Sequence, residues 1–483
     1  MNQEEKNSWI VCTECLGRGK KSRRLRKKVR LSYQKELTVF EKNNRKGKVP
    51  VRPKNHLYSC LKCAGSGLLP SSDYPLVDNE NFPHVAIIGG GIGGVALALA
   101  CLHRGIPFTL YERDLSFDAR SQGYGLTLQQ GSKAIKELGI TSLKEGVIST
   151  RHIVHNTEGE VIGEWGVRKW LGSDEKTAKK RTNIHISRQS LRLALIEELG
   201  GHNMVQWGHQ LIDYNEGEEG VDLKFQVDGK IKKAKADLVV GADGIRSVVR
   251  KLLIGEEVTP LHFLDCIVIL GICSLKDLNN VESSLLDSAT VFQTANGKER
   301  IYIMPYTSDS VMWQLSFPML EAEAKLLSQQ GAKALKKEAC LRTQWHHPIP
   351  QILAATHESM ITGYPVYDRE LLDPKLLEKG KMTTLIGDAA HPMSPFKGQG
   401  ANQALLDALE LSREIYKGCR PLSEWRKVGI RKSVLSAFES KALKRSAVKV
   451  KDSAEAAKFL HSEVVLKVAD EPRGRGIKKR ISK

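Results

Sequence analysis

Residues 387–392 read Gly-Asp-Ala-Ala-His-Pro, and the motif continues through Pro395, Gly398, Gly400 and Asn402. The apolar residues 384–386 predict a buried strand that ends just before Asp388. The glycines predict a tight turn, and we expect a helix to begin near Ala401. The first N–H groups of a helix have no partner within it, so this turn is suited to hold the polyol and anionic ring edge of a nucleotide cofactor.

A second nucleotide motif lies far upstream. Residues 84–88 read His-Val-Ala-Ile-Ile and residues 89–94 read Gly-Gly-Gly-Ile-Gly-Gly; a helical run and a second strand follow, ending at Glu112. The first glycine of such a motif makes the tight turn, the second lets a pyrophosphate approach the backbone, and the third lets helix and strand pack closely. Glu112 stands where dinucleotide folds place the acceptor of a ribose hydroxyl, and its charge would repel a 2′-phosphate.

A third element is the apolar run at 238–240, which leads into Gly-Ala-Asp-Gly at 241–244. Alone it is typical of an ordinary strand-to-helix corner. In the order glycine motif, Asp-Gly, Gly-Asp, however, the three elements resemble the flavin-dependent aromatic hydroxylases, the single-component monooxygenases typified by p-hydroxybenzoate hydroxylase. The resemblance covers about residues 83–420.

The resemblance implies a bound FAD, with NAD(P)H as co-substrate. It places the adenosine and pyrophosphate beside Gly89, Gly91, Gly93, Gly94, Glu112, Arg113 and Arg120. Arg188 is expected to open a helix and reach the cofactor, Asp243 to serve FAD and nicotinamide binding, and Asp388 to bind the ribityl hydroxyls. The segment beside the isoalloxazine ring would include Pro395, Gly398, Gly400, Ala401 and Asn402.

The implied reaction is hydroxylation of a small aromatic or related electron-rich compound by O2, through a flavin C4a-hydroperoxide. No catalytic constellation of side chains is evident, which agrees with chemistry carried by the cofactor. Three alternatives stay open: an oxidoreductase or epoxidase acting on an isoprenoid-type lipid, a flavin halogenase, and a flavin-bearing redox sensor or scaffold. The halogenase is the least favoured, because residues 165–170 do not match its Trp-x-Trp-x-Ile-Pro segment.

Four cysteines form a separate system near the N-terminus. The pattern Cys-x-x-Cys-x-Gly-x-Gly occurs twice, at 12–19 and 60–67. Each pair can place two thiolates on one tetrahedral ion. The repeat resembles the zinc region of DnaJ-type chaperones, and it predicts one structural Zn²⁺ site with the ligands Cys12, Cys15, Cys60 and Cys63. A redox-active Cys-x-x-Cys is the alternative, but the βαβ pattern around such motifs is missing here.

Positive charge is concentrated in the same region. The chain has a formal net charge of +19, and its first 75 residues hold 18 basic and 6 acidic side chains. This run is either a solvated surface or a docking site for an acidic partner or nucleic acid. We expect a cytoplasmic protein without a transmembrane segment, since no apolar run is long enough to span a bilayer and the N-terminus does not resemble a signal peptide.

These patterns predict an α/β protein: a Rossmann-like FAD-binding domain of the glutathione-reductase type, an interleaved antiparallel-sheet substrate domain and a small N-terminal zinc module. Alternating residues around a polar turn at 307–310 predict a hairpin in the substrate domain. Tyr302, Met304 and Trp313 are candidates to line the pocket, but the sequence does not set which face each occupies, and plain sheet core is the favoured role for any single one. The predicted segments are 1–79 (zinc module and linker), 80–260 and 365–420 (FAD-binding domain), 261–364 (substrate domain) and 421–483 (C-terminal helices and basic tail).

Overall fold

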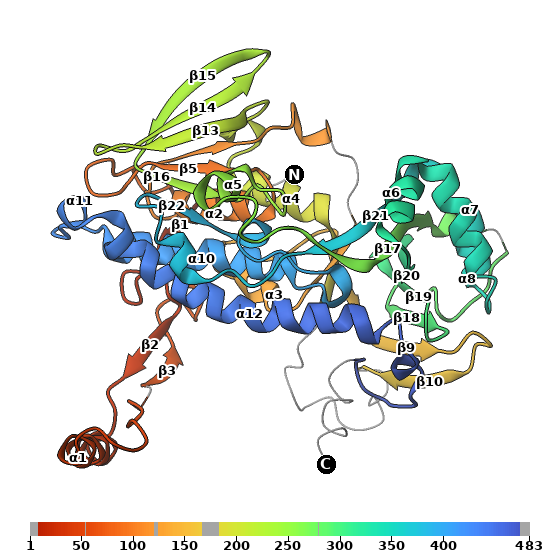
Figure 1. Ribbon diagram of the computed structural model, residues 1–483, viewed down its shortest axis with the longest axis horizontal. Helices are drawn as coiled ribbons and strands as arrows, with labels where there is room; N and C mark the ends of the chain where they lie inside the picture. The colour runs from red at the N-terminus through yellow and green to blue at the C-terminus, as the bar shows by residue number, and fades with distance from the viewer. Residues whose placement is uncertain (1–7, 54, 120–123, 167–182, 279, 474–483) are drawn as a thin grey trace. The chain divides into compact units, whose positions relative to one another are not determined.

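The protein is described by a computed structural model that covers residues 8–53, 55–119, 124–166, 183–278 and 280–473 (Figure 1). Its chain forms two compact units. One consists of residues 1–76 with 103–105, and the other of residues 77–102 with 106–483.

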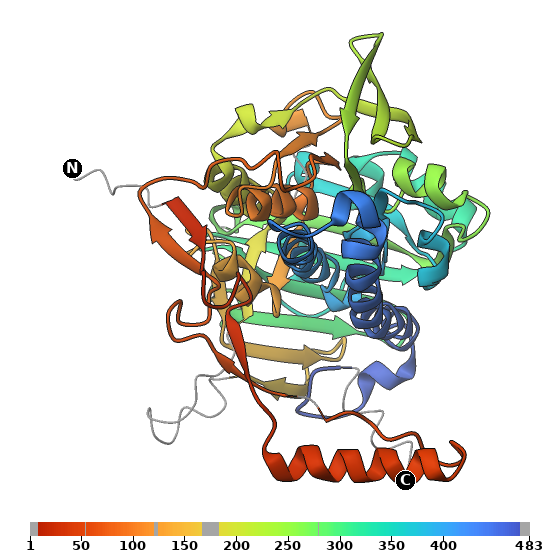
Figure 2. The same ribbon diagram turned by 90° about the vertical axis from the view of Figure 1, so that its left-hand side faces the viewer.

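The N-terminal unit holds two antiparallel strand pairs and one long helix (Figure 2). Strand β1 (Ser8–Val11) pairs with β4 (Leu68–Ser71), and β2 (Lys20–Arg23) pairs with β3 (His56–Ser59). One cysteine motif lies between β1 and β2 and the other between β3 and β4, so the two pairings bring the motifs together. Helix α1 (Lys27–Lys42) buries none of its residues.

The second unit is built on a parallel sheet whose strands run in the order β12-β6-β5-β16-β22. All neighbours in this sheet are parallel. Three strands are buried at every position, as expected for a sheet covered on both faces: β5 and β16 in the middle and β22 at one edge. The strands are β5 (Val85–Ile88), β6 (Phe108–Tyr111), β12 (Val205–Gln206), β16 (Leu238–Gly241) and β22 (Thr383–Leu385).

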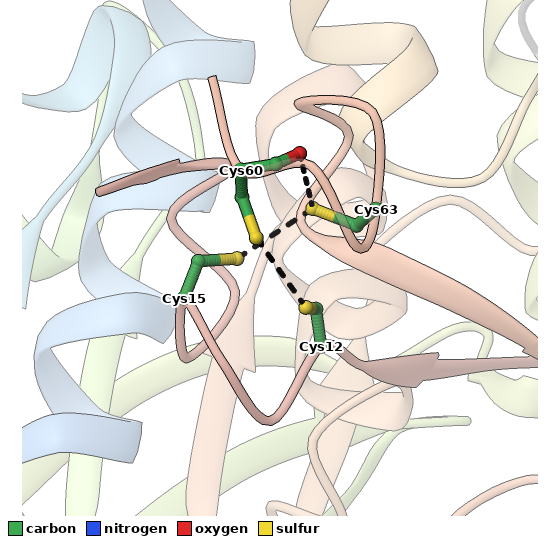
Figure 3. Close-up of side chains that lie close together, drawn as sticks. All are labelled: Cys12, Cys15, Cys60 and Cys63. Atoms are coloured by element: carbon green, nitrogen blue, oxygen red, sulfur yellow. Dashed lines mark hydrogen bonds between the residues drawn. The ribbon is translucent and has the colours of Figure 1, made fainter. Parts of the chain in front are cut away.

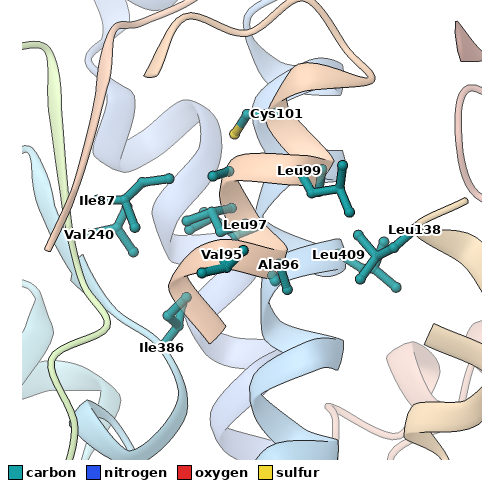
Figure 4. Close-up of a cluster of buried hydrophobic side chains, with 14 of the residues drawn as sticks. Ile87, Val95, Ala96, Leu97, Leu99, Cys101, Leu138, Val240, Ile386 and Leu409 are labelled. Carbon is teal, nitrogen blue, oxygen red and sulfur yellow. The ribbon is translucent and has the colours of Figure 1, made fainter. Parts of the chain in front are cut away.

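Helix α2 (Ile92–Leu102) is apolar all round, and it is buried because it packs on the sheet and on other helices. It contacts β5, β6, α4 (Arg188–Leu199) and α10 (Gly400–Gly418). Figure 4 shows Val95, Leu97 and Leu99 of this helix within the core, with side chains from the sheet and from α10 around them. The glycine turn before α2 is thereby anchored to the best-packed part of the unit.

A seven-stranded sheet has the order β10-β9-β18-β19-β20-β17-β21. Its neighbours are antiparallel except β9 and β18, which are parallel. The predicted hairpin is confirmed, with its turn between β19 and β20; β9 and β10 extend the sheet beyond the predicted segment 261–364. The strands are β9 (Arg151–His155), β10 (Val161–Trp165), β17 (His262–Ser274), β18 (Thr290–Ala295), β19 (Arg300–Thr307), β20 (Ser310–Pro318) and β21 (Ile361–Asp368).

Helices cover one face of this sheet. Two of them are α6 (Glu321–Gln329) and α7 (Ala332–Arg342). Gly331, which separates them, has φ +83°, a conformation that ends a helix. A third helix, α8 (Ile349–Ala355), follows.

The remaining elements include two three-stranded sheets, ordered β7-β11-β8 and β13-β14-β15. No helix among the described residues is both long and apolar enough to cross a membrane. The elements are β7 (Gly125–Leu128), α3 (Gly131–Glu137), β8 (Val147–Ser149), β11 (Asn183–Ser187), β13 (Gln210–Glu216), β14 (Val221–Val227), β15 (Lys230–Ala236), α5 (Val248–Ile254), α9 (Pro374–Leu377), α11 (Trp425–Val428) and α12 (Ser436–Phe459).

Candidate cofactor site and metal centre

Four of the predicted site segments meet at one edge of the parallel sheet. The glycine turn follows β5, Glu112 follows β6, Asp243 follows β16, and Asp388 follows β22. The register aligns these strand ends, because Ile88 pairs with Tyr111 and with Gly241, and Gly241 pairs with Leu385. Carboxyl ends of parallel strands are where open α/β sheets bind their ligands.

The glycine turn is closely packed against its own helix. A Cβ on Gly94 would lie 1.9 Å from the carbonyl oxygen of Gly89, and Gly89 itself has φ +112°. Only glycine fits at these two positions. Gly91 is different: a Cβ there would meet only the Nη2 atom of Arg188, at 3.8 Å. The space in front of Gly91 is therefore open to a ligand, and Arg188, the first residue of α4, reaches it.

Glu112 lies directly beside the glycine turn. Its Oε2 accepts a hydrogen bond from Gly90 N at 2.8 Å, and its Oε1 accepts one from Asp114 N at 3.0 Å. Arg192, which the sequence did not single out, donates from Nε to the carbonyl oxygen of Gly90 at 2.7 Å. Its Nη2 lies 3.9 Å from Glu112 Oε2, so an arginine of α4 holds the turn and the acid together.

Asp388 faces the start of α10. A Cβ on Gly400 would lie 3.3 Å from Asp388 Oδ1, so a side chain at this position would crowd the carboxylate where it approaches the helix. The side chain of Asp388 is exposed to solvent, although many protein atoms lie near it. Desolvation by those atoms raises the pKa of the carboxyl, and the nearby charges of His391 and Arg188 act to lower it. A ligand hydroxyl at this position would donate to the carboxylate.

The first turn of α10 is left open for a ligand. No side chain caps it, so the N–H groups of Gly400 and Ala401 have no acceptor within the helix. The side chain of Asn402 is fully used elsewhere: Oδ1 accepts from Gln129 N at 2.9 Å and from Gly131 N at 2.7 Å, and Nδ2 donates to two carbonyl oxygens. Asn402 thus ties a neighbouring loop to the helix start.

Asp243 shapes the chain as it enters α5. Its Oδ2 accepts from Val248 N at 2.7 Å, and its Oδ1 accepts from the hydroxyl of Ser247. Burial raises the pKa of this carboxyl, while those hydrogen bonds lower it. Arg250 of the same helix, another residue that the sequence did not reveal, donates from Nη1 to the carbonyl oxygens of Ala389 and Ala390 at 2.8 and 3.0 Å. The turn that carries Asp388 is therefore fixed from α5.

The other predicted residues occupy less informative places. Arg113 is exposed, and Arg120 lies outside the described residues. A Cβ on Gly93 would be 3.3 Å from the Cβ of Ala404, so this glycine lets α2 approach α10. Pro395 begins a short 3₁₀ turn that ends at Gly398, which has φ +56°.

The seven-stranded sheet separates the three predicted pocket residues. Tyr302 and Met304 lie on the face that also contacts Phe396, next to the Pro395–Lys397 turn. Trp313 lies on the opposite face, in the core against α7 and α8, and its Nε1 donates to Thr356 Oγ1 at 2.9 Å. Trp313 thus has the sheet-core role that was the alternative for each of these residues. Trp313 shares this face with Leu315 and Phe317, while the polar Gln314 and Ser316 alternate with them; because β20 is buried on both faces, the alternation alone does not say which face meets the cofactor.

These observations fit FAD. The open space at Gly91 matches a pyrophosphate, and Glu112 at the end of β6 matches a ribose. The exposed carboxylate of Asp388 matches a ribityl chain, and the uncapped start of α10 matches an anionic ring edge.

The second candidate site lies in the N-terminal unit. Figure 3 shows Cys12, Cys15, Cys60 and Cys63 pointing toward one another. Their sulfur atoms all lie within 4.8 Å of one another, and the Cys12–Cys60 and Cys15–Cys63 distances are 3.9 and 3.7 Å. Two thiolates on one tetrahedral ion with metal–sulfur bonds of about 2.3 Å are roughly 3.8 Å apart, so the spacing fits zinc.

Backbone groups of each motif support these sulfur atoms. Gly19 N donates to Cys15 Sγ at 3.3 Å, and Gly67 N donates to Cys63 Sγ at 3.2 Å. The motifs also hold each other, since Cys12 N donates to Gly67 O and Cys60 N donates to Gly19 O, each at 2.9 Å. The pKa values of the neighbouring thiols Cys15 and Cys63 move apart. Burial raises the pKa of Cys15 to about 12, whereas at Cys63 burial is outweighed by the hydrogen bonds from Gly67 and Gly65, which lower the pKa to about 7, so Cys63 is the thiol that favours the thiolate.

Comparison with known proteins agrees with the geometry. The FAD binding domain family matches residues 83–421. The aurachin C monooxygenase/isomerase of Stigmatella aurantiaca is 30% identical over 333 residues, covering 68% of this chain and 79% of that protein. The chloroplastic zeaxanthin epoxidase of Oryza sativa subsp. japonica is 26% identical over 69% of this chain, which spans only 49% of that relative.

Solved structures share the fold. HpxO of Klebsiella pneumoniae, complexed with FAD and uric acid, superposes with a TM-score of 0.64 at 19% identity, over 84% of this chain and 93% of that one. The sheet edge described above lies within the matched family region. The chain therefore belongs to the FAD binding domain family, as a flavoprotein of the FAD-dependent monooxygenase type.

Proposed function

We propose that this enzyme uses FAD, NAD(P)H and O2 to hydroxylate a small aromatic or related electron-rich compound. The observation that carries the proposal is the convergence of four strand ends with the uncapped start of α10. The face of the seven-stranded sheet that includes Tyr302 and Met304 packs against Phe396, just before this helix. Bound FAD would supply the electrons and the site of oxygen activation. The protein would hold the cofactor, orient the substrate and exclude water.

The cofactor would span the edge of the parallel sheet. Gly89, Gly91, Gly94 and Glu112 would hold the pyrophosphate and adenosine ribose, with Arg188 reaching the phosphates from α4. Asp388 would accept hydrogen bonds from the ribityl chain. Gly93 would serve through close helix packing, Asp243 through the turn into α5, and Arg113 from the segment after β6. Arg120 keeps its proposed place beside the pyrophosphate from the sequence alone.

The start of α10 has a separate role. Its N–H groups at Gly400, Ala401 and Asn402 would face the ring edge and stabilise negative charge that develops there on reduction. Pro395 and Gly398 form the turn that delivers the chain to this helix. The nicotinamide would bind transiently, since the sequence contains one glycine motif of the dinucleotide type.

The test is purification of the full chain with FAD, followed by NADH and NADPH oxidation with a panel of phenols, quinones and heterocycles under ¹⁸O2. We expect one panel member to accelerate flavin reduction and to gain one ¹⁸O atom. Oxidation of NAD(P)H without oxygen incorporation into any panel member would contradict the proposal.

We also propose that Cys12, Cys15, Cys60 and Cys63 hold one structural zinc ion. Four buried sulfur atoms at tetrahedral spacing, each motif donating N–H groups to sulfur, support it. Metal analysis of the purified protein should give one zinc per chain. A disulfide between these cysteines in protein kept under air, with no metal, would favour the redox alternative.

The basic surface of the N-terminal unit is a proposed docking site for an acidic partner. Helix α1 and strand β2 carry eight of the 18 basic side chains, and α1 buries none of its residues. A shift assay with RNA or DNA fragments at several salt concentrations tests whether the partner is a nucleic acid, because phosphate contacts weaken steeply with salt.

A further inference from the structure

A buried arginine on the seven-stranded sheet has no acidic partner among the residues that the structure describes. Arg300, the first residue of β19, is 5% exposed. Its Nε donates to Gln293 Oε1 at 2.7 Å, and its guanidinium lies over the ring of Tyr302 at 4.9 Å. Burial lowers its pKa to about 10, and no carboxylate in the described part of the chain offsets this. A buried cation normally pairs with an anion, because desolvating it costs several kcal/mol.

Other polar groups without obvious structural purpose surround it. Gln314 is 8% exposed, and its Nε2 has no hydrogen-bond partner among the described residues. Ser316, fully buried, is the register partner of Arg300 on β20. Its hydroxyl lies 2.9 Å from Nε2 of His461, and burial lowers the pKa of that imidazole, so it is neutral. Among the described residues, Gln314 Nε2 thus has no hydrogen-bond acceptor and Arg300 has no acidic partner, and both side chains lie on the same face of the sheet.

This side is the one that faces the proposed ring site. Arg300 alternates with Tyr302 and Met304 along β19, and these residues share a face with Phe396 of the Pro395–Lys397 turn. His461 meets Phe396 ring edge to ring face, with centroids 5.4 Å apart. The unpaired cation is therefore on the sheet face that we assign to the substrate.

We propose that Arg300 and Gln314 form a subsite for an anionic group of the substrate, and that the substrate is an aromatic acid or a stable enolate or phenolate rather than a neutral isoprenoid. The inference rests on the proposed function for the location of the reacting carbon. Guanidinium donors match a carboxylate in charge and geometry, and Gln314 Nε2 supplies a further donor. A neutral chain would leave both groups desolvated and unsatisfied.

The probes are matched pairs: salicylate with salicylamide, and anthranilate with its methyl ester. Binding to the FAD-loaded full chain is followed through perturbation of the flavin absorption spectrum, which needs no turnover. We expect at least one acid to bind about tenfold or more tightly than its neutral counterpart. Equal or tighter binding of the neutral members, or no binding of either acid, overturns the proposal.

Substitutions locate the effect. R300M should weaken acid binding by about tenfold or more and leave neutral binding unchanged, and R300K should restore part of it. Q314E, which places a carboxylate beside Arg300, should also weaken acid binding. The control is R342M, on α7, whose arginine already pairs with Glu299 and Glu338. Unchanged acid affinity in both R300M and Q314E contradicts the assignment.

These readouts separate the two proposals. An enzyme that binds acids through Arg300 but never incorporates ¹⁸O would refute the hydroxylase proposal and keep the subsite. An enzyme that hydroxylates a neutral compound with the same kcat and KM in R300M would refute the subsite and keep the hydroxylase. Should R300M fail to fold, as judged by thermal unfolding, R300K and Q314E carry the test.

Discussion

His391 Nε2 lies 2.6 Å from Asp407 Oδ2, and both side chains are buried. Arg445 contacts the other carboxylate oxygen of Asp407, and Gly387 N donates to Oδ2 at 2.9 Å. The buried group thus connects α10 and α12 to the turn that carries Asp388. Burial lowers the pKa of His391, but Asp407 outweighs this and the net pKa is raised; the pKa of Asp407 is lowered by His391 and Arg445 despite burial.

The His391–Asp407 pair should stabilise the fold in a pH-dependent way. H391Q should cost about 3 kcal/mol of unfolding free energy near pH 6, because it leaves Asp407 partly uncompensated. The folded pKa of His391 is raised above the unfolded value of about 6.5, so its contribution is complete below that pH and is lost as pH rises through the folded pKa. Denaturant unfolding of both proteins from pH 6 to 9 measures this. A cost that stays constant or grows with pH would refute the charged pair.

Two glycines of the first turn should respond differently to alanine. G94A places a Cβ 1.9 Å from Gly89 O, so it should lower both thermal stability and FAD affinity. G91A meets only Arg188 Nη2 at 3.8 Å, so FAD-free protein should keep its melting temperature while FAD affinity falls about tenfold or more. Calorimetry with and without FAD distinguishes the two. If G91A binds FAD as tightly as the unchanged protein, the pyrophosphate does not lie there.

Zinc removal should affect the N-terminal unit selectively. C15S and C63S should lose zinc and expose residues 8–76 to proteolysis, because the cysteines are the buried centre of that unit. The flavin spectrum should persist, since the parallel sheet has its own core. C340S, at a half-buried thiol on α7, is the matched control and should retain zinc. Full metal content in C15S and C63S would contradict the four-cysteine site.

Arg250 should matter for the cofactor although it sits on a helix behind the turn. R250M removes the donors to Ala389 and Ala390 and so should loosen the turn that presents Asp388. We expect weaker FAD binding that R250K does not restore fully, because lysine lacks the planar fork with which Arg250 also donates from Nε and Nη2 to Thr259 Oγ1. Isothermal titration with FAD checks this, and equal affinity in R250M would show that the turn is self-supporting.

The strand ends at the carboxyl edge of the parallel sheet were predictable because each has a local sequence pattern: an apolar strand followed by a glycine or an acidic residue. Glu112 and Asp388 needed no more than that. Arg192 and Arg250 were missed because their partners are 102 and 139 residues away in sequence, and no local pattern records such a contact. The face of Trp313 could not be chosen from the sequence, because β20 is buried on both faces and its alternation of Trp313, Leu315 and Phe317 with Gln314 and Ser316 does not say which face meets the cofactor. Strands β9 and β10 belong to the seven-stranded sheet because β9 pairs with β18. This pairing joins residues far apart in sequence, so no local pattern predicts it.

The central claim is that one FAD lies along the carboxyl edge of the parallel sheet, with its ribityl chain at Asp388. The most direct measurement is a spectrophotometric titration of FAD into the flavin-free full chain and into D388A. We predict one FAD per chain, and binding at least about tenfold weaker in D388A with an unchanged melting temperature of the flavin-free protein. A chain that takes up no FAD, or a D388A variant that binds it equally well, would contradict this account.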